Sequence, residues 1–149
     1  MSTRSYIAVQ DPENGTFQAI YCHFDGYPDH NGQILFDHYQ DPAKIARLFA
    51  LGDISALGPE IGLKQNFTHP TDTSWCVSYS RDRDEERGEN EVFANLKDLV
   101  SAFREDAMLE FLYVYYNGKW MFSDSTGRLK TFPADKCGVS ENGCCGDCG

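Results

Sequence analysis

The sequence predicts an α+β domain in which two to three helices pack on one face of an antiparallel sheet. Two observations predict this class. Asn-Gly dipeptides separate apolar, alternating segments at two places, a pattern typical of β-hairpins, and other segments repeat apolar residues at helical spacing. The expected order of elements is β-β-α-α-β-α-β-β. The 149 residues suffice for one core, so we expect a single domain over residues 1–133 and a tail rich in cysteine and glycine over residues 134–149.

The first hairpin is expected to join residues 6–9 to residues 16–24 through Asn14-Gly15, because both turn residues tolerate positive φ. The tightest register pairs Ile7 with Cys22. Side chains alternate along a strand, so this register fixes which residues share a face. One face then holds Ile7, Val9, Ile20, Cys22 and Phe24, and the other holds Tyr6, Ala8, Tyr21 and His23.

Two helices are expected to follow. Residues 34–39 fit a short helix. The second helix begins after Asp41, a favourable N-cap that precedes a proline, and ends at Gly52 as its C-cap. Its apolar residues Ile45, Leu48 and Phe49 keep the spacing of one helical face. Residues 58–72 contain prolines and glycines and are predicted to form a long loop.

The remaining elements are a strand, a helix and a second hairpin. Residues 73–80 alternate as a strand does. The helix repeats apolar residues over three turns, and the hairpin joins residues 110–116 to residues 119–123 around Asn117-Gly118. The helical face comprises Leu96, Leu99, Val100, Phe103 and Ala107; the hairpin register pairs Tyr115 with Trp120 and Tyr113 with Phe122.

The charge balance disfavours some classes of function. Thirteen Lys and Arg residues stand against 23 Asp and Glu residues, a net charge of −10, so the chain is expected to repel a nucleic-acid backbone. No stretch approaches the ~18 consecutive apolar residues of a membrane span, and the N-terminus lacks the layout of a signal peptide. We therefore expect no direct nucleic-acid binding, no membrane insertion and a cytoplasmic location.

The six cysteines divide into two groups. Cys22 and Cys76 lie inside expected strands, where free cysteine usually acts as a small buried hydrophobe. The other four lie within twelve residues near the end of the sequence, and their spacing includes one C-x2-C pair that suits a structural zinc site. A disulfide-linked tail and a flexible reduced tail remain alternatives. The four candidate zinc ligands are Cys137, Cys144, Cys145 and Cys148.

Histidines and carboxylates gather in the stretch from Gln10 to Asp41. Three imidazoles with nearby carboxylates supply the ligand types of a catalytic metal, and His23, Asp25 and His30 are the candidate centre. The alternative is a fixed turn through Asp25-Gly26 and Pro28, decorated by Tyr27 and His30. Nucleophilic catalysis by Cys22 and His23 is excluded because adjacent strand residues point to opposite faces. Neither a dinucleotide-binding nor a Walker motif is present.

A mixed-charge segment follows the predicted strand over residues 73–80. It is a candidate binding loop for a charged partner, or else a solvated loop with internal ion pairs. An arginine at a strand end could also pair with Asp25. The charged residues of this segment are Arg81, Asp82, Arg83, Asp84, Glu85, Glu86, Arg87 and Glu89, and the first six are the candidate binding residues.

Several short motifs together resemble a known group of proteins. They are Thr3-Arg4-Ser5 before a strand, His23-Phe24-Asp25-Gly26-Tyr27-Pro28, the segment Gly32-Gln33-Ile34-Leu35 with His38-Tyr39, and Arg81-Asp82-Arg83-Asp84-Glu85-Glu86-Arg87-Gly88-Glu89. The chain is similar to small, largely uncharacterised proteins encoded by tailed bacteriophages and prophages. The similarity covers about the first ninety residues, and the last motif is a lengthened version of the pattern. The cysteine-rich tail is not part of it.

The resemblance implies a context rather than a reaction. It implies an accessory phage product in a bacterial cytoplasm, a kind of protein that often binds and blocks a host protein, including restriction or CRISPR machinery. We therefore expect a non-enzymatic inhibitor whose partner has a basic surface, with binding residues Asp25, Tyr27, Asp29, His30 and Arg81 to Glu86. The alternatives are the metal-dependent enzyme and a homo-oligomer assembled through exposed aromatic residues such as Tyr27, Tyr113 and Tyr115.

Overall fold

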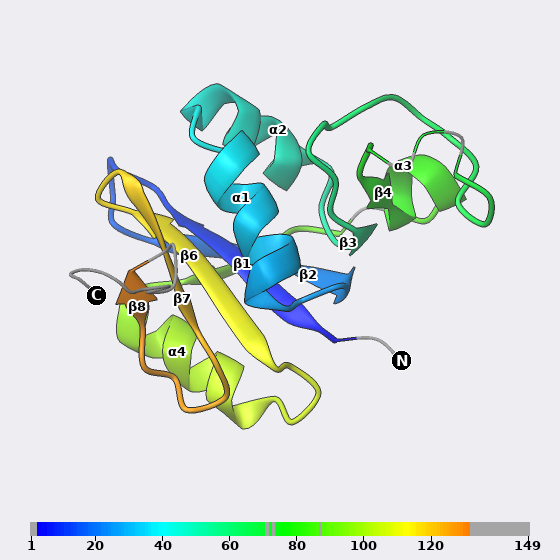
Figure 1. Ribbon diagram of the computed structural model, residues 1–149. Coiled ribbons are helices and arrows are strands. Elements are labelled where there is room, and N and C mark those ends of the chain that lie inside the picture. The colour runs from blue at the N-terminus through cyan, green and yellow to red at the C-terminus, as the bar shows by residue number, and fades with distance from the viewer. Residues whose placement is uncertain (1–2, 71, 73, 87, 132–149) are drawn as a thin grey trace.

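The computed structural model describes residues 3–70, 72, 74–86 and 88–131 (Figure 1). The strands are β1 (Ser5–Gln10), β2 (Phe17–Phe24), β3 (Ile54–Ala56), β4 (Val77–Ser78), β5 (Glu91–Phe93), β6 (Phe111–Tyr116), β7 (Lys119–Ser123) and β8 (Lys130–Thr131). The helices are the π-helical turn η1 (Pro28–Gly32), α1 (Gln33–His38), α2 (Pro42–Ala50), α3 (Tyr79–Arg83) and α4 (Leu96–Glu105). The predicted α+β class is confirmed. The predicted tail over residues 134–149 lies outside the described residues.

The eight strands in the described part of the chain belong to one mixed sheet. Its order is β4-β3-β2-β1-β6-β7-β8, and β5 pairs with β2 beside this path. The expectation of an antiparallel sheet is wrong at two places, because β1 and β6 are parallel and so are β2 and β3. In each case a helix lies in the connection between the strands, and a crossover through a helix lets the chain return in the same direction.

Helices cover both faces of this sheet, which corrects the prediction that they pack on one face (Figure 1). On one face α1 and α2 pack over Ile7 and Ile20; on the other, α4 packs over Ala8 and Ala19. Ala8 and Ala19 are direct cross-strand partners. A strand that is buried on both faces shows an unbroken apolar run instead of an alternating one.

The two Asn-Gly dipeptides form different turns. Asn117 and Gly118 both have positive φ, 55° and 76°, and the predicted pairing of Tyr115 with Trp120 is confirmed. At the first hairpin the pairing of Ile7 with Cys22 is wrong, because Ile7 pairs with Ile20. The loop there is longer: the backbone N–H of Asp11 donates to the carbonyl oxygen of Thr16 at 2.7 Å. The shift is two residues, so Ile7, Ile20 and Cys22 still share a face, as predicted.

The region predicted as one strand over residues 73–80 is mostly not a strand. Among residues 74–80, only Val77–Ser78 pairs with the sheet, and α3 begins directly after it. The side chain of Ser78 is the N-cap, since its Oγ accepts a hydrogen bond from the backbone N–H of Arg81 at 3.2 Å. The predicted helices over residues 34–39 and after Asp41 are confirmed, and Gly52 follows α2 with φ 77°.

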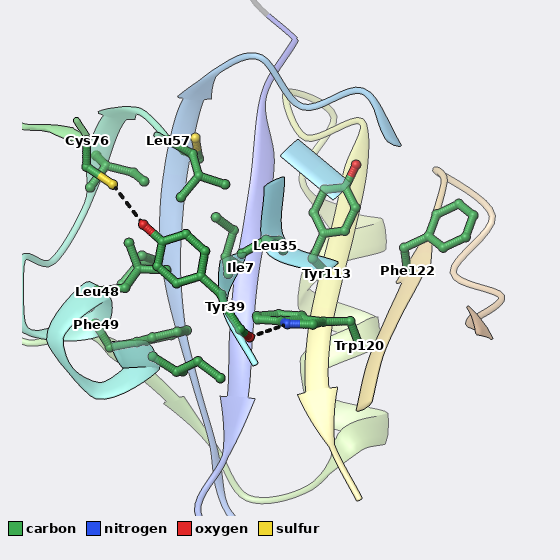
Figure 2. Close-up of a cluster of buried hydrophobic side chains, with 14 residues drawn as sticks. Ile7, Leu35, Tyr39, Leu48, Phe49, Leu57, Cys76, Tyr113, Trp120 and Phe122 are labelled. Carbon is green, nitrogen blue, oxygen red and sulfur yellow. Dashed lines mark hydrogen bonds between the residues drawn. The ribbon is translucent and has the colours of Figure 1, made fainter. Parts of the chain in front are cut away.

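The larger core lies between the sheet and the α1–α2 pair (Figure 2). Tyr39 is at its centre. Its carbonyl oxygen accepts a hydrogen bond from Trp120 Nε1 at 2.8 Å, and its hydroxyl donates to the carbonyl oxygen of Gly58 at 2.7 Å and lies 3.4 Å from Cys76 Sγ. Burial raises the pKa of Tyr39 well above its ordinary value. Tyr39 therefore links the end of α1, strand β7 and the loop after β3 through buried polar contacts.

Candidate partner-binding surface

Arg81 in α3 is occupied by contacts within the chain. Its guanidinium donates hydrogen bonds to the carbonyl oxygens of Ile61 at 2.9 Å and Cys76 at 2.8 Å, and its Nε donates to Asp82 Oδ1 at 2.9 Å. These contacts tie the long loop after β3 to the edge of the sheet. The carboxylate that pairs with Arg81 is therefore that of Asp82, and not that of Asp25, the pairing considered from the sequence.

Asp82 is buried, with 6% of its surface exposed. Its carboxylate also accepts hydrogen bonds from the backbone N–H groups of Gln65 at 2.9 Å and Ser78 at 2.8 Å. Burial on its own would raise the pKa of Asp82. The hydrogen bonds from Arg81, Ser78 and Gln65 outweigh that effect and hold the pKa below its ordinary value. Arg81 and Asp82 thus position the segment rather than present free charges.

The next residues point outward. The Arg83 guanidinium lies over the rings of Phe67 and Tyr79, 4.5 and 5.0 Å from their centroids, and forms an ion pair with Glu85. Asp84 has a left-handed backbone conformation, φ 57°, which ends α3 and turns the chain. Its carboxylate pairs with Lys64.

A small hollow, which we call the acidic recess, lies beyond the end of α3. It has a volume of about 130 Å³, and its lining includes four carboxylates: Asp53, Glu85, Glu86 and Glu89. Glu85, Glu86 and Glu89 belong to the charged segment that the sequence offers as a binding loop, whereas Asp53 was not a candidate. Asp53 follows the positive-φ residue Gly52 at the end of α2, and its Oδ1 accepts a hydrogen bond from the backbone N–H of Tyr21 at 2.9 Å. A hydrogen bond to the backbone of β2 thus holds one carboxylate of the recess in place.

The negative charge extends along the neighbouring face of the sheet. Burial raises the pKa of Tyr6, and the nearby carboxylates of Glu91, Asp106 and Asp53 raise it further. These three acids come from β5, from the end of α4 and from the residue before β3. Carboxylates distant in sequence therefore act on one tyrosine.

The other candidate residues, Asp25, Tyr27, Asp29 and His30, lie at the end of β2 and in η1. Tyr27 is 48% exposed and its ring lies 6.0 Å from that of Phe111. Asp29 and His30 are also exposed, and His30 Nδ1 lies 3.2 Å from the carbonyl oxygen of Asp25. The turn contacts the beginning of β1 and β6, whereas α3 contacts the loop after β3. The sequence candidates therefore form two groups with different neighbours.

His23 and Cys22, candidates for metal binding and thiol chemistry, lie on opposite faces of β2. His23 Nδ1 lies 2.7 Å from the hydroxyl of Tyr21, and burial, with the charge of Arg4, lowers the pKa of His23. Cys22 lies in the core on the opposite face, where burial raises its pKa to about 12. Within residues 3–70, 72, 74–86 and 88–131, no group of three or more His, Cys, Asp or Glu side chains is placed to hold a metal ion. Cys137, Cys144, Cys145 and Cys148 lie outside these ranges.

Two further observations bear on the alternatives. Tyr113, expected among exposed aromatic residues, is buried, and its hydroxyl donates to the carbonyl oxygen of Gly26 at 2.5 Å. In the part of the chain that the structure describes, no helix is both long and apolar enough to cross a membrane. Comparison with family models, curated proteins and solved structures found no match.

Proposed function

We propose that this chain is a non-enzymatic accessory protein, of the kind that phages encode, which binds a bacterial host protein through the acidic recess. The partner presents a basic surface, as the nucleic-acid-handling proteins of restriction and CRISPR defence do, and binding blocks or redirects it in the host cytoplasm. The observation that favours this function is the recess itself, whose lining includes Asp53, Glu85, Glu86 and Glu89. The net charge of −10 and the phage-like motifs agree with it.

The fold positions part of the recess before a partner binds. Asp53 is held by the backbone of Tyr21, and the bond between Arg81 and Asp82 fixes α3, from which the other acids follow. Charged groups that are already positioned lose less entropy on binding than mobile ones do. Opposite charge on the partner mainly accelerates association and suppresses wrong partners.

The experiment is affinity capture from a bacterial lysate, with the full chain as bait, at low salt and again at about 1 M salt, where the Debye length falls to ~3 Å. The expected result is a basic host protein that elutes as salt rises. The variant Glu85→Gln/Glu86→Gln/Glu89→Gln is expected to lose it. The control Asp37→Asn/Glu105→Gln/Glu110→Gln removes the same charge at exposed sites outside the recess and is expected to retain it. Equal capture by both variants contradicts the proposal.

A further inference from the structure

A groove with apolar walls opens on the surface beside α2. Its volume is about 540 Å³, within the ~300–1,000 Å³ of typical ligand pockets. Ile45 and Phe49 of α2 are 2% and 3% exposed and form its floor, and Tyr115 and Val9 line it from β6 and β1. We call it the apolar groove.

Small side chains keep the apolar groove open. Ala46 and Ala50 are exposed on α2 and line it, one turn apart. A larger residue at either position would reach across the floor. Apolar surface in an open hollow gains free energy when another apolar side chain covers it. The groove is thus suited to an aliphatic or aromatic anchor.

The apolar groove and the acidic recess adjoin. Asn90 lines both of them, and its Nδ2 donates hydrogen bonds to Gln18 Oε1 at 2.8 Å and to the carbonyl oxygen of Phe49 at 3.0 Å. The chain also passes from one to the other without a break, since Phe49 and Ala50 line the groove and residues 51–53 line the recess. An occupant of the groove therefore lies beside the acidic recess.

We propose that the groove and the recess together receive one segment of the basic partner, with an aliphatic or aromatic side chain in the groove and an arginine or lysine in the recess. This inference rests on the proposed function and adds the form of the partner's binding segment. Charge complementarity selects the occupant: acids line the recess, and Asp11 lines the groove.

The test is selection of a displayed random dodecapeptide library on the purified full chain. Enriched peptides are expected to combine an aromatic or aliphatic residue with an arginine or lysine a few positions away. A synthetic copy of the most enriched peptide, labelled with fluorescein, then reports affinity by fluorescence polarisation. Thermal unfolding of each variant checks that it folds.

Two variants separate the two subsites. Ala46→Trp fills the groove and is expected to weaken the peptide by about tenfold or more, the effect of losing one buried anchor side chain. Ala43→Trp, on the same helix but outside the groove lining, is its control and is expected to leave affinity unchanged. Glu85→Gln/Glu86→Gln/Glu89→Gln is expected to weaken binding and to flatten its dependence on salt.

Different results would overturn the two-part segment and the acidic recess as the binding site. Basic peptides without an apolar anchor, bound equally by Ala46→Trp and Ala43→Trp, overturn the two-part segment and leave the acidic recess as the binding site. Apolar peptides without a basic residue, insensitive to the triple variant, overturn both. A library that yields no enriched peptide above a bead-only selection overturns the two-part segment, whereas lysate capture still tests the recess.

Discussion

Arg81 donates hydrogen bonds to both carboxylate oxygens of Asp82, the next residue in the chain, at 2.9 and 3.1 Å. The same guanidinium reaches the carbonyl oxygens of Ile61 and Cys76, and the same carboxylate accepts from the backbone of Gln65. One pair of neighbouring side chains therefore joins α3, the loop after β3 and the edge of the sheet. The position of the acidic recess depends on this pair, because the acidic segment begins where α3 ends.

Replacement of Asp82 by Asn is expected to destabilise the fold. The amide cannot accept from Arg81, Gln65 and Ser78 as the carboxylate does, and the partly buried guanidinium loses its ion pair while keeping its carbonyl partners. We expect a loss of about 2–4 kcal/mol in the free energy of unfolding, measured by urea titration. Asp84→Asn is the matched control: Asp84 is exposed, its pair with Lys64 is worth at most ~1 kcal/mol, and asparagine tolerates its left-handed φ. Similar losses for both variants would refute the role given to Asp82.

The contribution of Asp82 is expected to depend on pH in one direction. Its pKa is lower in the folded chain than in the unfolded chain, so the stabilisation is complete above the unfolded pKa of about 3.9 and is lost as the pH falls through the folded pKa. The difference in unfolding free energy between wild type and Asp82→Asn is therefore expected to narrow as pH falls from about 6 to about 3. Urea titrations at several pH values measure it. A difference that stays constant or widens toward acid contradicts the assignment.

Cys22 and Cys76 are expected to resist alkylation in the folded protein. Both thiols are buried, and with the pKa of Cys22 raised to about 12, roughly one thiol in ten thousand is ionised at pH 8. Pulse labelling with iodoacetamide followed by peptide mapping is expected to leave both residues unmodified, and labelling in urea to modify both. Modification of either one under native conditions would show that the core opens there.

Gly118 is expected to be needed for its backbone alone. Its φ is +76°, and a Cβ at this position would meet no atom within 4 Å. Gly118→Ala therefore strains the backbone conformation without creating a steric clash. We expect a loss of about 1–2 kcal/mol. Gly88→Ala meets no atom within 4 Å either, and no such positive φ applies there, so its effect is expected to lie within ~0.5 kcal/mol. Thermal or urea unfolding of the two variants compares them, and equal stabilities would count against a left-handed turn at Gly118.

The elements that the sequence predicts correctly are those set by local signals. The Asn117-Gly118 hairpin and the helix after Asp41 each follow from a few adjacent residues. The burial of β1 on both faces does not follow from local signals. A small residue such as Ala8 fits a solvent-exposed face of a sheet as well as a face that a helix such as α4 covers. The strand predicted over residues 73–80 fails because the hydroxyl of Ser78 caps a helix, and contacts distant in sequence, such as that between Arg81 and Ile61, hold this helix in place.

The sequence predicts part of the candidate site, namely the part that a local run of charged residues marks. Glu85 and Glu86 stand out as part of a charged run, and the recess contains them. Asp53 is a single acid after a glycine, and the pairing of β3 with β4 brings it beside Tyr79, which also lines the recess. Arg81 and Asp82 look like solvent-exposed charges in sequence, yet they are the internal support of the segment. A charge run does not reveal which members point inward.

The most direct test of the central claim is the salt dependence of binding between the purified chain and the basic protein that it captures, measured by titration calorimetry across a range of salt concentrations. The recess account predicts that affinity falls steeply with salt for wild type and for Asp37→Asn/Glu105→Gln/Glu110→Gln, and that Glu85→Gln/Glu86→Gln/Glu89→Gln binds more weakly with a shallower slope. A triple recess variant that binds with the affinity and slope of wild type would contradict it.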